Sequence, residues 1–244
     1  MKTKFVITSM LLFFSYTMNA QDWWRSKNRI KGNGNQITKT RTVSSFNEIN
    51  VGGSFEVILV KGTEGKITIE AEENIIPYIE TEVDGDRLKI QYKRNTNIRS
   101  TKSVTIRVQI KDLESVSLGG SGKISSEDLI KAKDFKVNIG GSGNIDLHLE
   151  VQNGSASIGG SGNLILRGKA EKMRSKIAGS GSIKAYAFTA DDLNASIAGS
   201  GNIKITVQTK IKAKVVGSGN IYYKGNPKHV DTKSIGSGDV IDKN

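Results

Sequence analysis

Seven Gly-Ser-Gly triplets recur along the second half of the chain at a spacing that constrains the fold more than any other feature. Their first glycines are Gly120, Gly141, Gly160, Gly179, Gly199, Gly217 and Gly236. The intervals between them are 21, 19, 19, 20, 18 and 19 residues. A period near 19 that persists over residues 116–240 is typical of stacked repeats, in which each unit packs mainly on its neighbours.

Apolar residues alternate with polar ones on both sides of each triplet. Two places before the first glycine stand Leu118, Ile139, Ile158, Ile177, Ile197 and Val215, and the seventh repeat has Ser234. Four places after it stand Ile124, Ile145, Leu164, Ile183, Ile203, Ile221 and Val240. This period of two predicts strands with one buried face. Each repeat therefore reads as a strand, a glycine corner, a second strand and another turn.

Units of this kind predict an all-β solenoid. Nineteen extended residues cover at most about 60 Å, a suitable circumference for one coil, and equivalent residues on successive coils would lie about 4.8 Å apart. The isoleucines would then stack into a continuous core. An antiparallel barrel or a propeller is the alternative, but a four-stranded propeller blade would need two repeats.

The first half of the chain lacks the clean period, although it is also rich in strand patterns. Residues 55–60, 66–71, 87–92 and 104–110 all read as strands, and Asp84-Gly85 predicts a tight hairpin turn. A short helical turn is expected in 72–80, and faint corners at 31–35 and 51–54. We predict one solenoid domain over 31–244, with irregular coils in 31–115 and regular coils in 116–244.

The N-terminus has the pattern of a secretory signal. Lys2 and Lys4 precede an apolar stretch, residues 5–14, that is too short to span a bilayer. We predict a signal peptide over 1–20 with cleavage between Ala20 and Gln21, followed by a flexible basic and aromatic arm over 21–30. The mature chain contains no second apolar run long enough for a transmembrane helix.

Composition narrows the location and the partners. The chain has no cysteine, so we expect neither disulfides nor an N-terminal lipid anchor, and we predict a periplasmic or extracellular protein that is not a lipoprotein. The net charge of +12 favours acidic partners such as anionic glycans or lipid head groups. The alternative is a lysine-covered β surface that stays soluble and avoids edge-to-edge pairing.

The triplets do not match the known glycine-rich ligand loops. A phosphate-binding loop needs a lysine and a hydroxyl residue entering a helix, whereas each triplet enters a strand. Calcium-binding β-rolls place an aspartate where this chain has Ile145 or its equivalents, and an apolar side chain cannot bind a hard cation. Seven repeated serines with only His148 and His229 as imidazole bases do not indicate a catalytic serine. Glycine therefore serves corner geometry.

Other chemistry has little support in the sequence. Two histidines 81 residues apart and no cysteine argue against a transition-metal site, and we expect no catalytic residues, no metal and no cofactor. A pair of carboxylates of the glycosidase kind stays open, since any two of the 24 acidic residues could meet in space.

One outward pattern suggests a binding surface. Lysines recur at equivalent positions of neighbouring repeats, and like charges on adjacent coils repel. The predicted polyanion-binding face consists of Lys176, Lys184, Lys204, Lys214 and Lys233. The alternative is that these lysines are merely solvated.

Several segments resemble a known family. "KGNGNQITKTRTVSSFNEINVGGSFEVILVKG" (31–62), "AEENIIPYIETEVDGDRLKIQYK" (71–93), "LESVSLGGSGKI" (113–124) and the later "GSGNI" elements follow its order. The chain is similar to the putative autotransporter adhesin head GIN domain family, exported proteins found mainly in Bacteroidetes. The resemblance implies a right-handed parallel β-helix at the cell surface or in the periplasm, and it supplies no catalytic residues.

We therefore expect an exported, non-enzymatic module that binds glycan or another anionic envelope polymer through the solenoid surface. A glycan-active lyase or hydrolase is the first alternative, and a structural envelope component is the second. Partners would be an anionic polysaccharide or an envelope component rather than nucleic acid. Oligomers could form by end-to-end or side packing.

Overall fold

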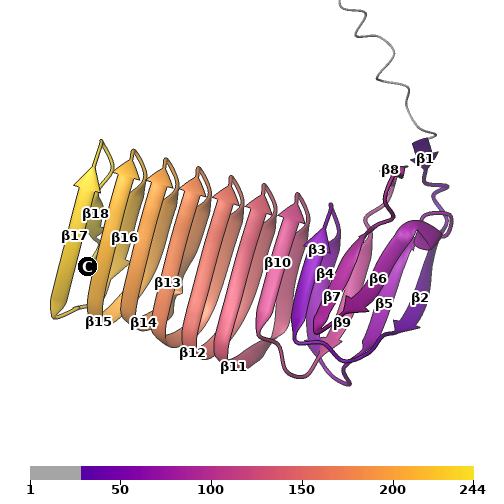
Figure 1. Ribbon diagram of the computed structural model, residues 1–244, viewed down its shortest axis with the longest axis horizontal. Helices are drawn as coiled ribbons and strands as arrows, with labels where there is room; N and C mark the ends of the chain where they lie inside the picture. The colour runs from indigo at the N-terminus through magenta and orange to yellow at the C-terminus, as the bar shows by residue number, and fades with distance from the viewer. Residues whose placement is uncertain (1–28) are drawn as a thin grey trace, which may run out of the picture.

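The computed structural model describes residues 29–244, and strands account for most of them (Figure 1). The predicted signal peptide, residues 1–20, and most of the predicted arm, residues 21–28, lie outside the described residues. The last two residues of that arm belong to a short strand, β1 (Arg29–Lys31), which pairs in parallel with β8 (Asn97–Arg99).

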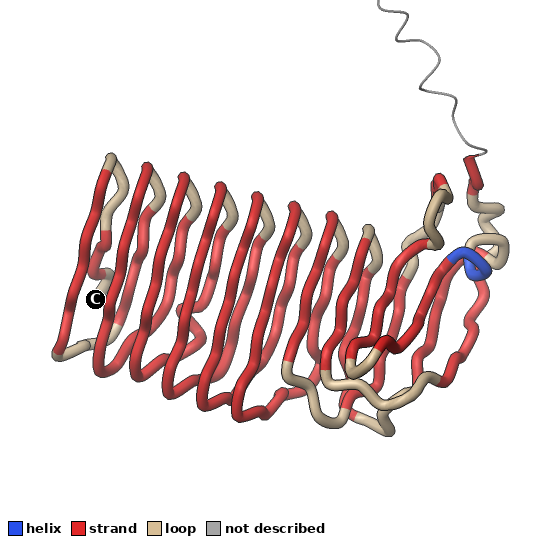
Figure 2. Tube along the Cα trace, viewed as in Figure 1, coloured by secondary structure: helices blue, strands red, loops and turns tan. Residues whose placement is uncertain are grey.

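The triplet half of the chain is a parallel solenoid, as the spacing predicts. Its strands are β10 (Ser115–Gly120), β11 (Lys123–Gly141), β12 (Asn144–Gly160), β13 (Asn163–Gly179), β14 (Ser182–Gly199), β15 (Asn202–Gly217), β16 (Asn220–Lys224), β17 (His229–Ile235) and β18 (Val240–Asp242). Each pairs in parallel with its equivalent in the next coil. The triplets occupy the breaks between consecutive strands and line up along one edge (Figure 2).

Each coil contributes to two layers that face one another across the core (Figure 1). We call the half of a coil before its triplet the pre-corner layer, for example 172–179, and the half after it the post-corner layer, for example 182–188. The long strands β11 to β15 pass through both layers because each bends at the edge opposite the triplets. Outward side chains of the two layers therefore point in opposite directions.

The core is the stack of apolar residues that the alternation predicts. Ile139, Ile158, Ile177 and Ile197 are consecutive partners in the ladder, and all are buried. The row four places before the triplet glycine is also buried, and in β13 it contains Ser175, whose hydroxyl has no hydrogen-bond partner. The stacking weakens at β17, where Thr232 and Ser234 replace apolar residues and are exposed.

The glycines of the triplets are required by the geometry of the corner. Gly160 has φ of +129°, and a Cβ there would lie 2.6 Å from the carbonyl oxygen of Gly141 in the preceding coil. A Cβ on Gly162 would lie 2.7 Å from the carbonyl oxygen of Gly143. The triplet serine between them is exposed and bonds through its backbone, since the N–H of Ser161 donates to Gly141 O at 3.0 Å.

The irregular first half continues both layers. Its remaining elements are β2 (Gln36–Thr42), β3 (Glu48–Gly52), β4 (Glu56–Lys61), β5 (Lys66–Glu72), η1 (Ile76–Tyr78), β6 (Ile79–Asp84), β7 (Arg87–Tyr92) and β9 (Thr105–Ile110). β3 and β7 extend the pre-corner layer, and β4 and β9 extend the post-corner layer, all in parallel. β6, β5 and β2 then close the sheets with antiparallel pairs, including the predicted hairpin at Asp84-Gly85.

Of the two faint corners expected in the first half, the structure contains one. Residues 51–54 form the first corner of the stack, where the N–H of Gly53 donates to Gly119 O at 2.8 Å. Residues 31–35 instead comprise the end of β1 and the loop after it, which lies against the buried carboxylate of Glu72. This carboxylate accepts hydrogen bonds from the N–H of Gly34 and from the N–H and hydroxyl of Thr101. The Thr101 hydroxyl makes the largest contribution to holding the pKa of Glu72 below its ordinary value.

Candidate functional site

The structure divides the five predicted lysines between the two layers. Lys176, Lys214 and Lys233 share one outward row of the pre-corner layer, in the order Lys176, Ser196, Lys214 and Lys233. Lys184 and Lys204 are ladder partners in the post-corner layer. The expected single face is therefore corrected to two, because the corner turns the chain over between the two sets.

The pre-corner layer carries two basic stripes that the sequence analysis did not identify. One consists of Lys172, Arg174 and Lys176 on β13, and the other of Lys210, Lys212 and Lys214 on β15. All six side chains are exposed, because they alternate with buried residues along their strands. The coil between the stripes presents Asp192, Asn194 and Ser196 at the same three positions.

Carboxylates of the chain leave these stripes largely unneutralised. Lys212 forms an ion pair with Asp231 at 3.7 Å, and both side chains are mostly exposed. The other five stripe residues form no ion pair within residues 29–244. The face is thus a concentrated positive field that an anionic partner could neutralise.

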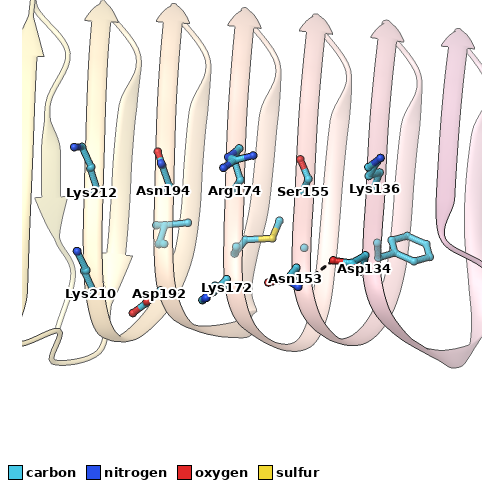
Figure 3. Close-up of a pocket in the computed structure, with 14 residues that line it drawn as sticks. Asp134, Lys136, Asn153, Ser155, Lys172, Arg174, Asp192, Asn194, Lys210 and Lys212 are labelled. Atoms are coloured by element: carbon cyan, nitrogen blue, oxygen red, sulfur yellow. Dashed lines mark hydrogen bonds between the residues drawn. The ribbon is translucent and has the colours of Figure 1, made fainter.

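A groove of about 430 Å³ crosses the stripes and the coils before them (Figure 3). Its polar lining comprises Asp134, Lys136, Asn153, Ser155, Lys172, Arg174, Asp192, Asn194, Lys210 and Lys212. Gly154 lies in the inward row between Phe135 and Met173 and leaves a gap there, which the Met173 sulfur partly fills. Asp134 accepts a hydrogen bond of 2.9 Å from the amide of Asn153, and five cations outnumber two carboxylates along the lining.

The stripes do have a sequence signal. "KMRSK" (172–176) and "KIKAK" (210–214) both alternate basic and buried residues, and both lie at the same phase relative to their triplets. Alignment of the repeats by their glycines places these segments two coils apart. Each stripe runs along a single coil, so lysines at one repeat position in neighbouring coils do not reveal it.

Of the two predicted post-corner lysines, Lys204 belongs to a smaller cluster with two tyrosines. The Lys204 and Lys243 ammonium groups lie 5.7 and 5.5 Å from the centre of the Tyr222 ring, and Lys224 lies 5.1 Å from that of Tyr186. Burial is the main cause that raises the pKa of Tyr186. These ammonium groups are already engaged with aromatic rings, an attraction worth about 0.5–1 kcal/mol at an exposed site.

A second groove of about 1070 Å³ lies along the edge opposite the triplets. Its acidic residues are Glu150, Glu171 and Asp191. Lys131 and Lys169 lie 3.4 and 3.2 Å from the Glu150 carboxylate, and they hold its pKa below the ordinary value, with the Lys169 hydrogen bond contributing most. A glycosidase acid needs a raised pKa, so Glu150 is unsuited to that role.

Residues 29–244 contain neither a cluster of metal ligands nor a membrane-spanning helix. Within residues 29–244, no three His, Asp or Glu side chains gather where they could hold a metal ion. No helix in the same range has the length and apolarity needed to cross a membrane.

Several solved structures with this architecture come from Bacteroidetes. A putative adhesin from Bacteroides fragilis aligns with a TM-score of 0.83 at 26% identity, covering 88% of this chain and 100% of that one. A putative lipid binding protein from Parabacteroides distasonis aligns at 0.75 and 28% identity, covering 88% and 100%. A putative adhesin from Parabacteroides merdae aligns at 0.72 and 27% identity, covering 88% and 99%.

No curated protein matches the sequence. The family model of the putative auto-transporter adhesin head GIN domain matches residues 45–227, which include the first corner, the closing strands β5 and β6 and the solenoid coils up to β16. This match confirms the resemblance that the ordered segments indicate, and the chain belongs to that adhesin head family.

Proposed function

We propose that the protein is an exported, non-enzymatic envelope module that binds an anionic polysaccharide or a similar anionic envelope polymer through the two basic stripes. The observation that carries this proposal is the set of six exposed cations on β13 and β15, of which only Lys212 has an acidic partner in the described chain. Clustered cations on a rigid sheet attract anions at long range and need little reorganisation to bind them.

The shape of the site favours a polymer over a compact ligand. The groove is shallow and spans β11 to β15, so a ligand could contact several coils at once without being enclosed. Each contact would be weak, because exposed ion pairs contribute about 0.2–1 kcal/mol. A chain molecule gains affinity by making several such contacts together.

The family and the structural neighbours agree with a surface role of this kind. Two of the neighbours are described as putative adhesins, and one is described as a putative lipid binding protein. An anionic polysaccharide accounts for the stripes better than a lipid does, since the coil between them presents polar Asn194 and Ser196. On the stripe strands themselves, a single large apolar side chain of this layer, Val216, is exposed.

The test is a matched pair of charge reversals. Arg174→Glu with Lys212→Glu changes the charge of the stripes, and Lys184→Glu with Lys204→Glu makes the same net change on the opposite layer. We expect the first pair to weaken binding to purified anionic polysaccharides about tenfold or more, equal to about 1.4 kcal/mol. The second pair should change it by less than about twofold. Calorimetry on the mature protein provides the affinities.

Two controls accompany this comparison. The wild-type dissociation constant should rise with salt, and the stripe variant should show a shallower dependence because fewer counterions are released. The length distribution of the polysaccharide should stay unchanged during incubation, since the proposal includes no catalysis. Equal losses in both variants, no binding by the wild type, or shortening of the polymer would contradict the proposal.

A further inference from the structure

Basic and non-basic coils alternate along the solenoid axis in the groove. In the row five places before the triplet glycine, the ladder order is Lys136, Ser155, Arg174, Asn194 and Lys212. Figure 3 shows these five side chains side by side on successive strands. Cations therefore recur at every second coil of this row, which corresponds to steps of about 10 Å.

The next row toward the opposite edge follows the same order over its last three coils. Lys172, Asp192 and Lys210 are consecutive ladder partners, so a carboxylate separates the two cations. In the row three places before the triplet glycine, Ser196 separates Lys176 from Lys214. This row carries Asn138 and Ser157 in β11 and β12, and Lys233 follows Lys214 directly past β15, so its alternation is confined to β13–β15.

Avoidance of like-charge neighbours does not by itself explain this arrangement. Like charges directly opposite each other on adjacent strands are destabilising, which favours alternation within each row. However, the three rows could alternate out of phase, and the cations would then be spread over all coils. Instead, three cations share β13 and three share β15, where neighbours two residues apart lie only about 7 Å from each other.

We infer that the stripes select polysaccharides that carry an anionic group on every second sugar. This inference rests on the proposed function. A step of about 10 Å between cations matches the length of a disaccharide unit in an extended chain lying along the solenoid axis. Anionic sugars would pair with Lys136, Arg174 and Lys212, and the neutral sugars between them would face Ser155 and Asn194, whose hydroxyl and amide can hydrogen-bond sugar hydroxyls.

The carboxylate of Asp192 adds selectivity against other polymers. It lies between Lys172 and Lys210 and has no ion-pair partner among the described residues. A polymer with an anionic group on every sugar would place one of them at this coil. Like-charge repulsion would then lower its affinity per charge.

The experiment compares two polymers of different charge spacing on the same protein. Hyaluronan carries one carboxylate per disaccharide, and polygalacturonate carries one on every sugar. At equal carboxylate concentration and moderate salt, we expect hyaluronan to bind about fivefold tighter or more, equivalent to about 1 kcal/mol. Affinity should rise from the hyaluronan tetrasaccharide to the hexasaccharide, which has a carboxylate for each of the three cations.

A single added charge tests the spacing directly. Asn194→Lys places a cation in the intervening coil, and we expect it to raise the affinity for polygalacturonate and to remove the preference for hyaluronan. Ser182→Lys adds the same charge to the post-corner layer and should leave the preference unchanged. Both sites are on the surface of well-paired strands, and circular dichroism confirms that the variants fold.

The outcomes separate this inference from the function on which it rests. Tighter binding of polygalacturonate by the wild type, with losses in the stripe variant, would overturn the spacing and leave anionic-polymer binding intact. An unchanged preference in Asn194→Lys would also overturn it. Failure of every anionic polymer to bind would overturn both.

Discussion

The corner glycines offer a stringent test of the structure, because of two adjacent glycines one has no room for a side chain and the other has. Gly160 has φ of +129°, and an added Cβ would lie 2.6 Å from Gly141 O. The neighbouring Gly159 has no positive φ, and its nearest contact would be Ile139 O at 3.9 Å. We therefore expect Gly160→Ala to destabilise the solenoid strongly and Gly159→Ala to have little effect.

The magnitude follows from two contributions. An alanine held at a φ that favours glycine costs about 1–3 kcal/mol. The short contact would also push the preceding coil away, and the N–H of Ser161, which donates to Gly141 O at 3.0 Å, would lose a hydrogen bond worth about 1 kcal/mol. The total is about 2–4 kcal/mol. Gly159→Ala should stay within about 0.5 kcal/mol, with a small gain from the less flexible unfolded chain.

Chemical denaturation followed by circular dichroism measures the difference. Because a solenoid depends on contacts between neighbouring coils, unfolding need not be a single step, and the midpoint is the appropriate quantity. Hydrogen exchange should also accelerate in β12 and β13, which flank the altered corner. Equal midpoints for the two variants would refute the assignment of Gly160 to a sterically closed corner.

Two further predictions concern buried polar groups. Ser175→Ala should raise stability by about 1 kcal/mol, because the serine hydroxyl is buried without a partner, and Ser196→Ala, outward on the next coil, should have almost no effect in the same denaturation assay. The hydrogen bonds of Glu72 lower its folded-state pKa, so its contribution is complete above the unfolded-state pKa and is lost as the pH falls through the folded value. Glu72→Gln should therefore flatten the dependence of the thermal midpoint on pH over the acidic range, and an unchanged acidic slope would contradict this role.

The regular coils are predictable from the sequence because each inward position is constrained by two neighbours. Ile139, Ile158 and Ile177 must be apolar to stack, and the triplet glycines must be glycine to let coils approach. The same steric demand recurs every 19 residues or so, and its period reveals the fold. The first corner at 51–54 shows the same signal in weaker form, since β3 and β4 continue the two layers.

The first half of the chain is less predictable because each of its closing strands makes contacts that occur once and do not recur in other coils. The 31–35 segment resembles a corner in composition, yet its glycines serve the approach to Glu72: a Cβ on Gly32 would lie 2.0 Å from the Glu72 carboxylate. Such a contact joins residues 40 positions apart and leaves no periodic trace. The antiparallel pairing of β2 with β5 likewise depends on contacts that the local pattern does not encode.

The outward positions explain why the predicted binding face joined residues of two layers. The core does not constrain which residues occupy the outward positions, so a regular pattern of charges there reflects something other than packing of the core. Lysine columns found three residues of the pre-corner layer, Lys176, Lys214 and Lys233, but joined them to Lys184 and Lys204 across a corner that reverses the facing direction. When charged residues are compared within each coil as well as between coils, the two layers separate, and the segments 172–176 and 210–214 stand out as basic. In a solenoid the regular spacing of glycines therefore determines the scaffold, and the two-dimensional pattern of charges on each layer is where a binding specificity can be encoded.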